Sequence, residues 1–178
     1  YEDLGYFTCD PAITSDVTDL FNLLTGYAPD QEFEKLLVAP KYLRKRVTDL
    51  IEREIEEARS GRKGLIIAKM NALEDPLMIQ KLYEASEAGV EIDLIVRGVC
   101  RLIPGKEGVS ENIRVHSVIG RFLEHSRIYY FHGAGEDFYA IGSADLMHRN
   151  LDARVETVTP IEPKELKAYL QYLLNLIM

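Results

Sequence analysis

The stretch GLIIAKMNALEDPLMIQKLYEASEAGVEIDLIVRG, residues 64–98, decides the fold. It begins with an apolar run at residues 64–68 and ends with a second one at 90–96, and both are typical of buried strands. Between them, Asp75 and Pro76 form a helix start, and apolar residues follow at helical spacing. Because the links are short, we predict a βαβ unit with two parallel, adjacent strands covered by helices, and therefore an α/β fold.

Polar side chains follow the two predicted strands at their carboxyl ends. Lys69 and Asn71 come after the first strand, and Arg97 comes after the second. Ligands of open α/β sheets gather outside the carboxyl ends of the strands. We therefore expect these three residues at a phosphate- or nucleotide-binding edge.

The remaining segments extend the predicted sheet and its helical cover. Upstream we predict a helix capped by Thr14, a polar link at residues 28–34, a strand at 36–39 and a helix after Pro40. Downstream we predict strands at residues 113–118, 125–131, 138–141 and 154–158, a hairpin loop at 133–137, and a final helix whose inward residues are Leu166, Leu170, Leu173, Leu174 and Ile177. This last helix packs on its own domain or, alternatively, forms an oligomer contact.

Composition excludes several classes of function. The 178 residues are 47% hydrophobic, enough to bury a core, and the net charge of −8 argues against nucleic acid or an anionic membrane as a partner. Cys9 and Cys100 lie far apart without metal-ligand spacing, so we expect reduced thiols and a cytoplasmic location. No apolar run is long enough to span a bilayer. The start at Tyr1, without Met, leads us to expect a piece of a longer protein.

One histidine lies in a pattern that points to phosphate chemistry. His125 and Arg127 are two residues apart at the start of an apolar run, so they share one face of a strand. Imidazole exchanges protons near neutral pH, and guanidinium binds phosphate oxygens bidentately. Farther on come Gly142-Ser143-Ala144-Asp145, Arg149-Asn150 and Glu156. We expect Glu156 to orient the imidazole through its second nitrogen.

The order of these residues resembles one half of the phospholipase D superfamily, in which His-x-Lys is followed by Gly-Ser-Ala-Asn and a late Glu. Three positions depart from that pattern. Arg127 replaces the Lys, His132 stands where Asp is expected, and Asp145 replaces the Asn. A simple phosphodiesterase is therefore the weaker interpretation.

A second resemblance covers nearly the whole chain and accommodates these departures. The runs that resemble bacterial polyphosphate kinase, in order, are residues 3–11, 66–76, 89–100, 110–115, 121–127 and 149–152. Arg101 stands where that family often has a second Cys, and His148 where Pro or Thr is expected. The resemblance implies a phospholipase-D-like domain with a mixed sheet flanked by helices, in residues 31–178. Residues 1–30 would then end the preceding phospholipase-D-like domain.

The resemblance also implies an activity. The family reversibly transfers the terminal phosphate of ATP to polyphosphate through a phosphohistidine, with Mg²⁺ as cofactor, in a tunnel between two such domains. The phosphorylated histidine and most of the Mg²⁺ site belong to parts upstream of this chain. His125 matches the second essential histidine, Arg97 an arginine that contacts the ATP phosphates, and Arg154 and Glu156 an active-site pair.

We therefore predict two catalytic residues, His125 and Glu156, and no metal ligand. The expected ATP- and phosphate-binding residues are Arg97, His125, Arg127, Arg149, Arg154, Lys69 and Asn71. The other histidines and the tyrosines of the apolar runs are expected to be structural or exposed. The expected partners are ATP or ADP, polyphosphate, the remaining domains of the same chain and further copies in a homo-oligomer. Peripheral attachment to the inner membrane remains an open alternative for the location.

Two other functions stay open on the residues alone. One is a single-site phosphodiesterase that dimerises to bring two copies of His125 together. The other is a noncatalytic module that binds polyanions through the same basic residues. No GxxxxGK(S/T) run is present, so nucleotide binding of the P-loop type is not expected.

Overall fold

The computed structural model describes residues 1–27 and 32–178, which form seven strands and five α-helices among these residues. The elements in chain order are α1 (Pro11–Leu24), β1 (Leu37–Val38), α2 (Leu43–Arg59), β2 (Leu65–Met70), α3 (Pro76–Glu87), β3 (Glu91–Val96), β4 (Ile113–His116), β5 (Arg127–Phe131), the 3₁₀ turn η1 (Gly133–Gly135), β6 (Phe138–Gly142), α4 (His148–Asp152), β7 (Thr157–Pro160) and α5 (Lys164–Ile177).

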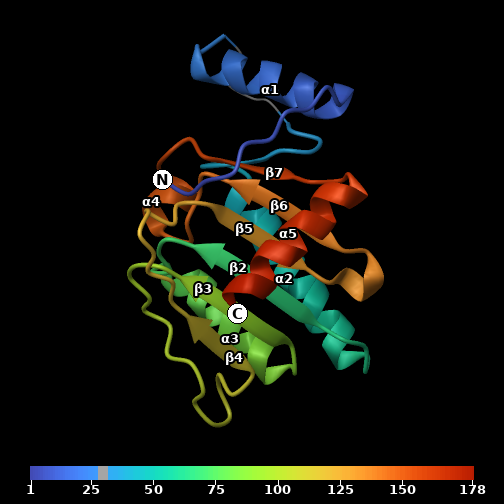
Figure 1. Ribbon diagram of the computed structural model, residues 1–178. Coiled ribbons are helices and arrows are strands. Elements are labelled where there is room, and N and C mark those ends of the chain that lie inside the picture. The colour runs from blue at the N-terminus through green and yellow to red at the C-terminus, as the bar shows by residue number, and fades with distance from the viewer. Residues whose placement is uncertain (28–31) are drawn as a thin grey trace.

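The strands form one mixed sheet in the order β1-β7-β6-β5-β2-β3-β4 (Figure 1). β2 pairs with β3 in parallel, with Leu65 opposite Glu91, and β3 pairs in parallel with β4. β5, β6, β7 and β1 join by antiparallel pairing. The predicted βαβ unit and the mixed sheet flanked by helices are therefore confirmed.

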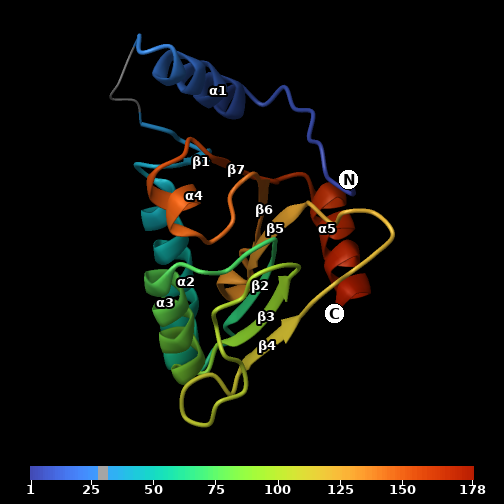
Figure 2. The same ribbon diagram turned by 90° about the vertical axis from the view of Figure 1, so that its left-hand side faces the viewer.

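Helices cover both faces of the sheet in three layers (Figure 2). α2 and α3 pack on one face, over the largest apolar cluster, which includes Ile51, Leu82 and Leu94. α5 covers the other face, where Leu170 and Leu174 are buried against the sheet. The predicted inward position of Leu166 is wrong, because this side chain lies at the rim of the α5 contact and is 38% exposed.

The N-terminus of α1 differs from the prediction. Asp10, not Thr14, caps the helix, and its carboxylate accepts hydrogen bonds from the amides of Ala12 and Ile13. Pro11 occupies the first helical position, where its lack of an N–H costs nothing. Thr14 instead donates its hydroxyl to the Asp10 carbonyl from inside the first turn.

A buried carboxylate ties α1 to the rest of the fold. Asp16 accepts hydrogen bonds from the amides of residues 34, 35 and 36, at 3.0, 2.6 and 2.8 Å. These amides precede β1, so α1 is held over the β1 edge of the sheet. The predicted link at residues 28–34 and the predicted domain boundary at residue 30 fall largely outside the described residues.

Two strand boundaries shift in a way that affects the site. β5 begins at Arg127 rather than at His125, and β7 begins at Thr157 rather than at Arg154. The amide of His125 donates to the carbonyl of Glu2, in the N-terminal segment, instead of to a strand of the sheet. His125 thus lies at the entrance to β5. Within the described part of the chain, no helix has the length and apolar character that a membrane crossing requires.

Candidate active site

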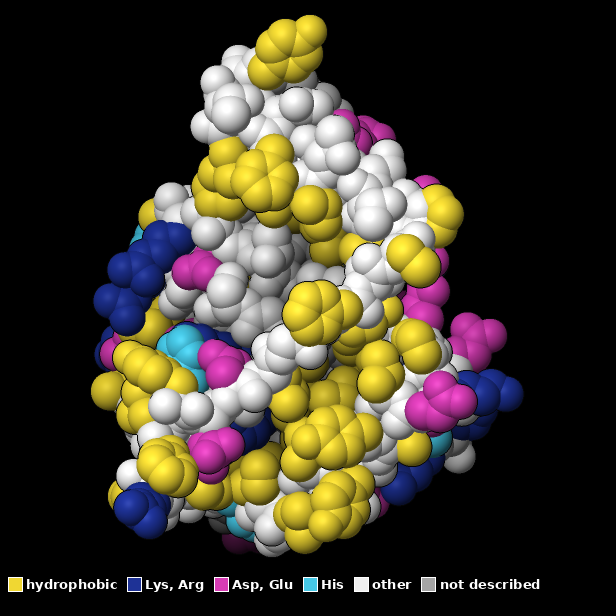
Figure 3. All heavy atoms as spheres, turned by 45° about the horizontal axis from the view of Figure 1, so that its top comes forward, with side chains coloured by type: hydrophobic (Ala, Val, Ile, Leu, Met, Phe, Trp, Pro, Cys, Tyr) yellow, Lys and Arg dark blue, Asp and Glu magenta, His cyan; other side chains and the backbone are white. Residues whose placement is uncertain are grey.

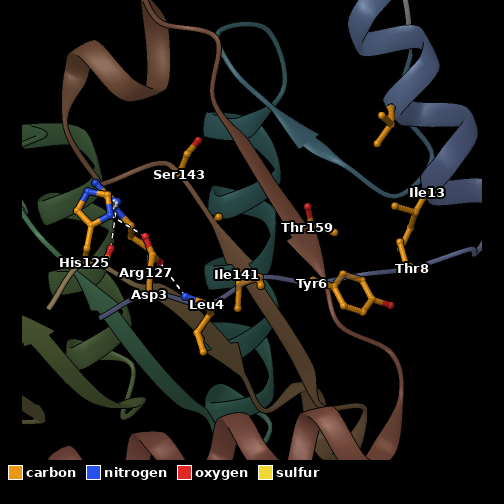
Figure 4. Close-up of a pocket in the computed structure, with 12 residues that line it drawn as sticks. Asp3, Leu4, Tyr6, Thr8, Ile13, His125, Arg127, Ile141, Ser143 and Thr159 are labelled. Carbon is orange, nitrogen blue, oxygen red and sulfur yellow. Dashed lines mark hydrogen bonds and ion pairs between the residues drawn. The ribbon is translucent and has the colours of Figure 1, made fainter. Parts of the chain in front are cut away.

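The imidazole of His125 lies at the edge of the sheet where β5 begins, and its side chain is 34% exposed. Its Nδ1 is 2.8 Å from the Oδ2 atom of Asp3. The ring of Tyr1 contacts it edge-on, with 5.0 Å between the ring centroids. Figure 4 shows the Asp3 and Arg127 side chains turned toward the imidazole. The ring is therefore held by the N-terminal segment from one side and by β5 from the other.

Arg127 shares a face with His125, as the sequence predicts. Its Nη1 lies 3.1 Å from Nε2 and 3.3 Å from Nδ1 of the imidazole and donates to the His125 carbonyl at 3.0 Å. Its Nε and Nη2 reach the two carboxylate oxygens of Asp145 at 3.1 and 3.2 Å. Asp145 is itself buried and accepts the amide of Asn71 at 2.8 Å. The guanidinium is thus fixed at both ends, which positions it against the ring.

These contacts determine the tautomer of the imidazole. Burial acts to raise the pKa of Asp3, but its hydrogen bonds to His125 and to the amide of Leu4 outweigh burial and lower that pKa. An ionised carboxylate only accepts, and a guanidinium only donates. Nδ1 of His125 therefore carries a hydrogen toward Asp3, and Nε2 lies on the Arg127 side of the ring. A neutral imidazole in this tautomer would have its lone pair on Nε2, from which it could accept a proton or attack an electrophilic phosphorus atom.

The predicted contact between Glu156 and the imidazole is wrong. The Glu156 carboxylate instead accepts hydrogen bonds from the hydroxyl of Ser143 and the side-chain amide of Asn150. Asp3 makes the contact that we expected of Glu156. Strand pairing explains the difference. Glu156 directly precedes β7, and the pairing of β7 with β6 brings its carboxylate to Ser143, the residue that follows β6.

A cavity of about 400 Å³ opens in front of these residues. Its polar wall includes Asp3, His125, Arg127 and Ser143, and α1 contributes Ile13 to the opposite wall (Figure 4). Figure 3, which views the molecule from the α1 side, shows the surface hollowed beneath this helix, with a histidine and an acidic side chain at the rim. The imidazole thus faces an open space large enough for a phosphate group.

The structure separates the other predicted basic residues from this cavity. Arg97 lines a second cavity of about 390 Å³, together with residues 118–124. Its Nε is buried without a hydrogen-bond partner among the described residues. Arg149 and Arg154 are exposed, on and just after α4. Of the predicted basic residues, only Arg127 contacts His125 in the described part of the chain.

Lys69 and Asn71 are both buried, and neither lines the two cavities. The Lys69 ammonium donates to Ser126, and Lys69 lies inside β2 rather than after it. Both polar atoms of the Asn71 side chain lack a partner among the described residues. The structure therefore gives neither residue direct access to the His125 cavity.

Among the described residues, one group of side chains has the spacing of a metal site: Asp75, His148 and Asp152. Arg44 already occupies it, because its guanidinium donates to both carboxylates. Hydrogen bonds to Asp75 and Asp152 raise the pKa of Arg44. The charge that a cation would supply is thus provided by an arginine, and we assign this group to an ion-pair network that links α2, α3 and α4.

Comparisons with known proteins identify the family. The family model "Polyphosphate kinase C-terminal domain 2" matches residues 36–178. The polyphosphate kinase of Synechocystis sp. is 56% identical over the whole chain, and that of Prochlorococcus marinus is 57% identical. The chain spans 24% and 25% of the length of these two relatives.

Solved structures agree with this assignment. The crystal structure of polyphosphate kinase from Porphyromonas gingivalis matches 94% of the chain, and 26% of its own length, with a TM-score of 0.90 and 45% identity. NucT from Helicobacter pylori matches 80% of the chain, and 92% of its own length, with a TM-score of 0.58 and 11% identity, which shows a shared fold alone. The phospholipase D family member Nuc from Salmonella typhimurium also shares the fold: it matches 78% of the chain, and 89% of its own length, with a TM-score of 0.52 and 16% identity. The chain therefore belongs to the polyphosphate kinase family, and residues 36–178 correspond to its C-terminal domain 2.

Proposed function

We propose that this chain is the carboxy-terminal catalytic part of a polyphosphate kinase that reversibly transfers the terminal phosphate of ATP to polyphosphate. The single observation that carries the proposal is the imidazole of His125, with Nδ1 on Asp3 and Nε2 beside Arg127, at the wall of an open cavity. The two relatives named polyphosphate kinase are 56% and 57% identical to the chain over its whole length, which supports ATP and polyphosphate as the substrates.

The proposed reaction divides the work between this domain and the rest of a longer protein. The bond between the γ-phosphorus and the bridging oxygen of ATP breaks, ADP leaves, and a histidine upstream of this chain takes the phosphoryl group. The terminal oxygen of polyphosphate then attacks the phosphorus of that phosphohistidine, so that a new P–O bond lengthens the polymer while the N–P bond breaks and the histidine is released. Because such transfers rely on positioning and charge neutralisation, we assign His125 to hold or exchange a proton at the phosphate oxygens through Nε2.

Charged side chains around His125 supply the remaining contacts in this proposal. Arg127 lies beside the imidazole at the cavity wall, whereas Arg97, Arg149 and Arg154 lie outside this cavity, and their predicted contacts with phosphate groups would have to be made elsewhere on the substrate. Glu156 acts by holding Ser143 at the cavity wall. The guanidinium of Arg127 would stabilise negative charge on the oxygens of the transferred group.

Mg²⁺ accompanies ATP in the proposed reaction and neutralises part of the phosphate charge. The described residues do not fit a dedicated site for it, since the carboxylates with suitable spacing are paired with Arg44. We therefore expect the nucleotide and the upstream part of the protein to hold the ion. We also retain, as proposals, residues 1–30 as the end of a preceding domain and a homo-oligomeric full-length enzyme.

The test compares two histidine substitutions in the full-length protein that contains this chain. His125→Ala should lower polyphosphate synthesis by about 10²- to 10⁴-fold, the usual contribution of a positioned proton carrier. His116→Ala, on β4 and outside both cavities, is the matched control and should keep its activity. Near-normal synthesis by His125→Ala would contradict the proposal.

The isolated chain offers a second test. It should not take up radiolabel from γ-labelled ATP on a histidine, because the nucleophile belongs to another part of the protein. Stable labelling of His125 would contradict the division of labour. Hydrolysis of a simple phosphodiester by the isolated chain would favour a phosphodiesterase instead.

A further inference from the structure

The segment just before β5, which carries His125, is hydrogen-bonded to a buried lysine, Lys69. Side chains alternate along an extended chain, so His125 and Arg127 point toward the His125 cavity and Ser126 points to the opposite side of the chain. Lys69 extends to Ser126 on that side from β2, which pairs with β5 and places Lys69 opposite Ile128. Lys69 is 3% exposed and Ser126 is 8% exposed, so the contact lies inside the protein.

All partners of the lysine ammonium flank the imidazole in sequence. Nζ of Lys69 donates to the carbonyl of Ser126 at 3.0 Å and to its hydroxyl at 2.8 Å. It also lies 3.4 Å from the Oε2 atom of Glu124. An ammonium has three hydrogens, and these contacts use them on the residues immediately before and after His125. With these contacts to described residues in place, the ammonium has no hydrogen left to donate to a phosphate group.

We propose that Lys69 is a positioning residue for His125, which fixes the backbone on either side of the imidazole and so sets where the ring meets the cavity. The kinetic part of this inference depends on the proposed role of His125, whereas the geometric part does not. Among the described residues, the segment before β5 pairs with no strand of the sheet, and without Lys69 it would be held by the backbone pairing with Glu2 and by the contacts of Asp3 and Arg127 with His125.

The apolar surroundings of Lys69 make its contacts with Ser126 and Glu124 necessary for its stability. The neighbouring positions on the same face, such as Ile67 and Ile128, belong to the apolar cluster beneath α5. Burial lowers the pKa of Lys69, and the carboxylate of Glu124 opposes this effect. A charged group in such a place is stabilised only by full pairing, and its removal leaves the Ser126 carbonyl and Glu124 without their donor.

Steady-state kinetics of the full-length enzyme separate positioning from phosphate binding. Lys69→Met keeps the length of the side chain and removes its donors, so kcat should fall by about ten- to a hundredfold, as expected when a reacting group is displaced by a fraction of an ångström to 1 Å. The KM for ATP should stay within about twofold, because the lysine does not touch substrate. Lys63→Met, at an exposed position before β2, is the matched control and should change neither constant. A raised KM with unchanged kcat would assign Lys69 to phosphate binding and overturn the proposal.

A second measurement uses this chain itself and needs no activity. Nitrogen-15 NMR of the His125 imidazole should show shifted or broadened signals in Lys69→Met and in Ser126→Ala, with the far-ultraviolet circular dichroism unchanged. Ser126→Ala removes only the hydroxyl contact, so it carries the test if Lys69→Met does not fold. Unchanged imidazole signals in a folded variant would overturn the inference. If the signals shift but His125→Ala retains activity, the positioning role stands and the proposed function fails.

Discussion

Three side chains from distant parts of the sequence determine what the imidazole of His125 can do. Asp3 accepts a hydrogen bond from Nδ1, Arg127 places a positive charge beside Nε2, and Lys69 donates to the backbone carbonyl of Ser126, the residue after His125. Asp145 completes the arrangement by fixing the guanidinium at its far end. The orientation of the ring and the hydrogen on Nδ1 are therefore properties of the whole set rather than of the histidine alone.

Removal of the Asp3 carboxylate should change the tautomer of His125. In Asp3→Ala the Nδ1–H loses its acceptor, so the nitrogen-15 signature of the Nδ1–H tautomer should weaken or vanish. Glu2→Ala is the matched control: it removes a neighbouring carboxylate, while the contacts of Glu2 with residues 123 and 125 are made by its backbone. An unchanged tautomer in Asp3→Ala would show that Asp3 does not govern the ring.

Sequence reasoning found the residues of this site that are close together in the chain and missed a distant one. His125 and Arg127 were predictable because strand alternation places them on one face. Asp3 was not, because it lies 122 positions away and only the folded chain brings it to the imidazole. The sequence predicts Glu156 in the place that Asp3 occupies. This prediction fails because the pairing of β6 with β7, which the sequence does not reveal, directs the Glu156 carboxylate to Ser143. The roles of the remaining predicted phosphate-binding residues stay predictions.

At the scale of elements, the junction between β6 and β7 positions Ser143 and Glu156. Gly142 ends β6 and lies opposite Val158 of β7. The two backbones approach so closely there that a Cβ on Gly142 would lie 2.7 Å from Cα of Val158. The absence of a side chain is thus a condition for the pairing. The sequence predicted both strands, but placed the start of β7 three residues too early, because Val155 extends the apolar pattern without joining the sheet.

Gly142→Ala should therefore destabilise the fold by about 1–3 kcal/mol, since rigid backbone atoms have to move apart. It should also separate Ser143 from Glu156. Urea unfolding followed by circular dichroism measures the effect. Gly5→Ala is the matched control, because a Cβ at that position meets nothing within 4 Å. Equal stability of the two variants would mean that the strands adjust at no cost.

At the scale of the whole molecule, one arginine ties together the helices on the face of the sheet opposite α5. Arg44 of α2 donates to Asp75, which caps α3, and to Asp152 at the end of α4. Asp75 is 2% exposed, so this carboxylate depends on its partner for compensation. Hydrogen bonds from Arg44 lower the pKa of Asp152 against the opposing effect of burial. For Asp75, burial acts to raise the pKa, but its hydrogen bonds to Arg44 and Met78 outweigh burial.

Arg44→Met should lower the free energy of unfolding by about 3 kcal/mol near neutral pH, because it leaves a buried carboxylate unpaired. Carboxyl groups with a lowered pKa contribute stability above their ordinary value, 3.8, and lose it as the pH falls through the lowered one. The difference between variant and wild type should therefore shrink as the pH falls below about 4. Urea unfolding at pH 7, 5 and 3 measures this. Arg62→Met, which breaks an exposed pair with Glu57, should have little effect at any of these pH values. A pH-independent loss in Arg44→Met would point to packing rather than charge.

The pairing of the N-terminal segment with residues 123–125 has a consequence for how the chain folds. The βαβ unit forms from neighbours in sequence, whereas Asp3 meets His125 only after the chain has closed a loop of 122 residues. Loop closure over such a distance costs entropy before any contact repays it. The topology therefore favours an order of assembly in which the sheet is complete before the imidazole acquires its partner, so that the contact between Asp3 and His125 is among the last that the nascent molecule forms.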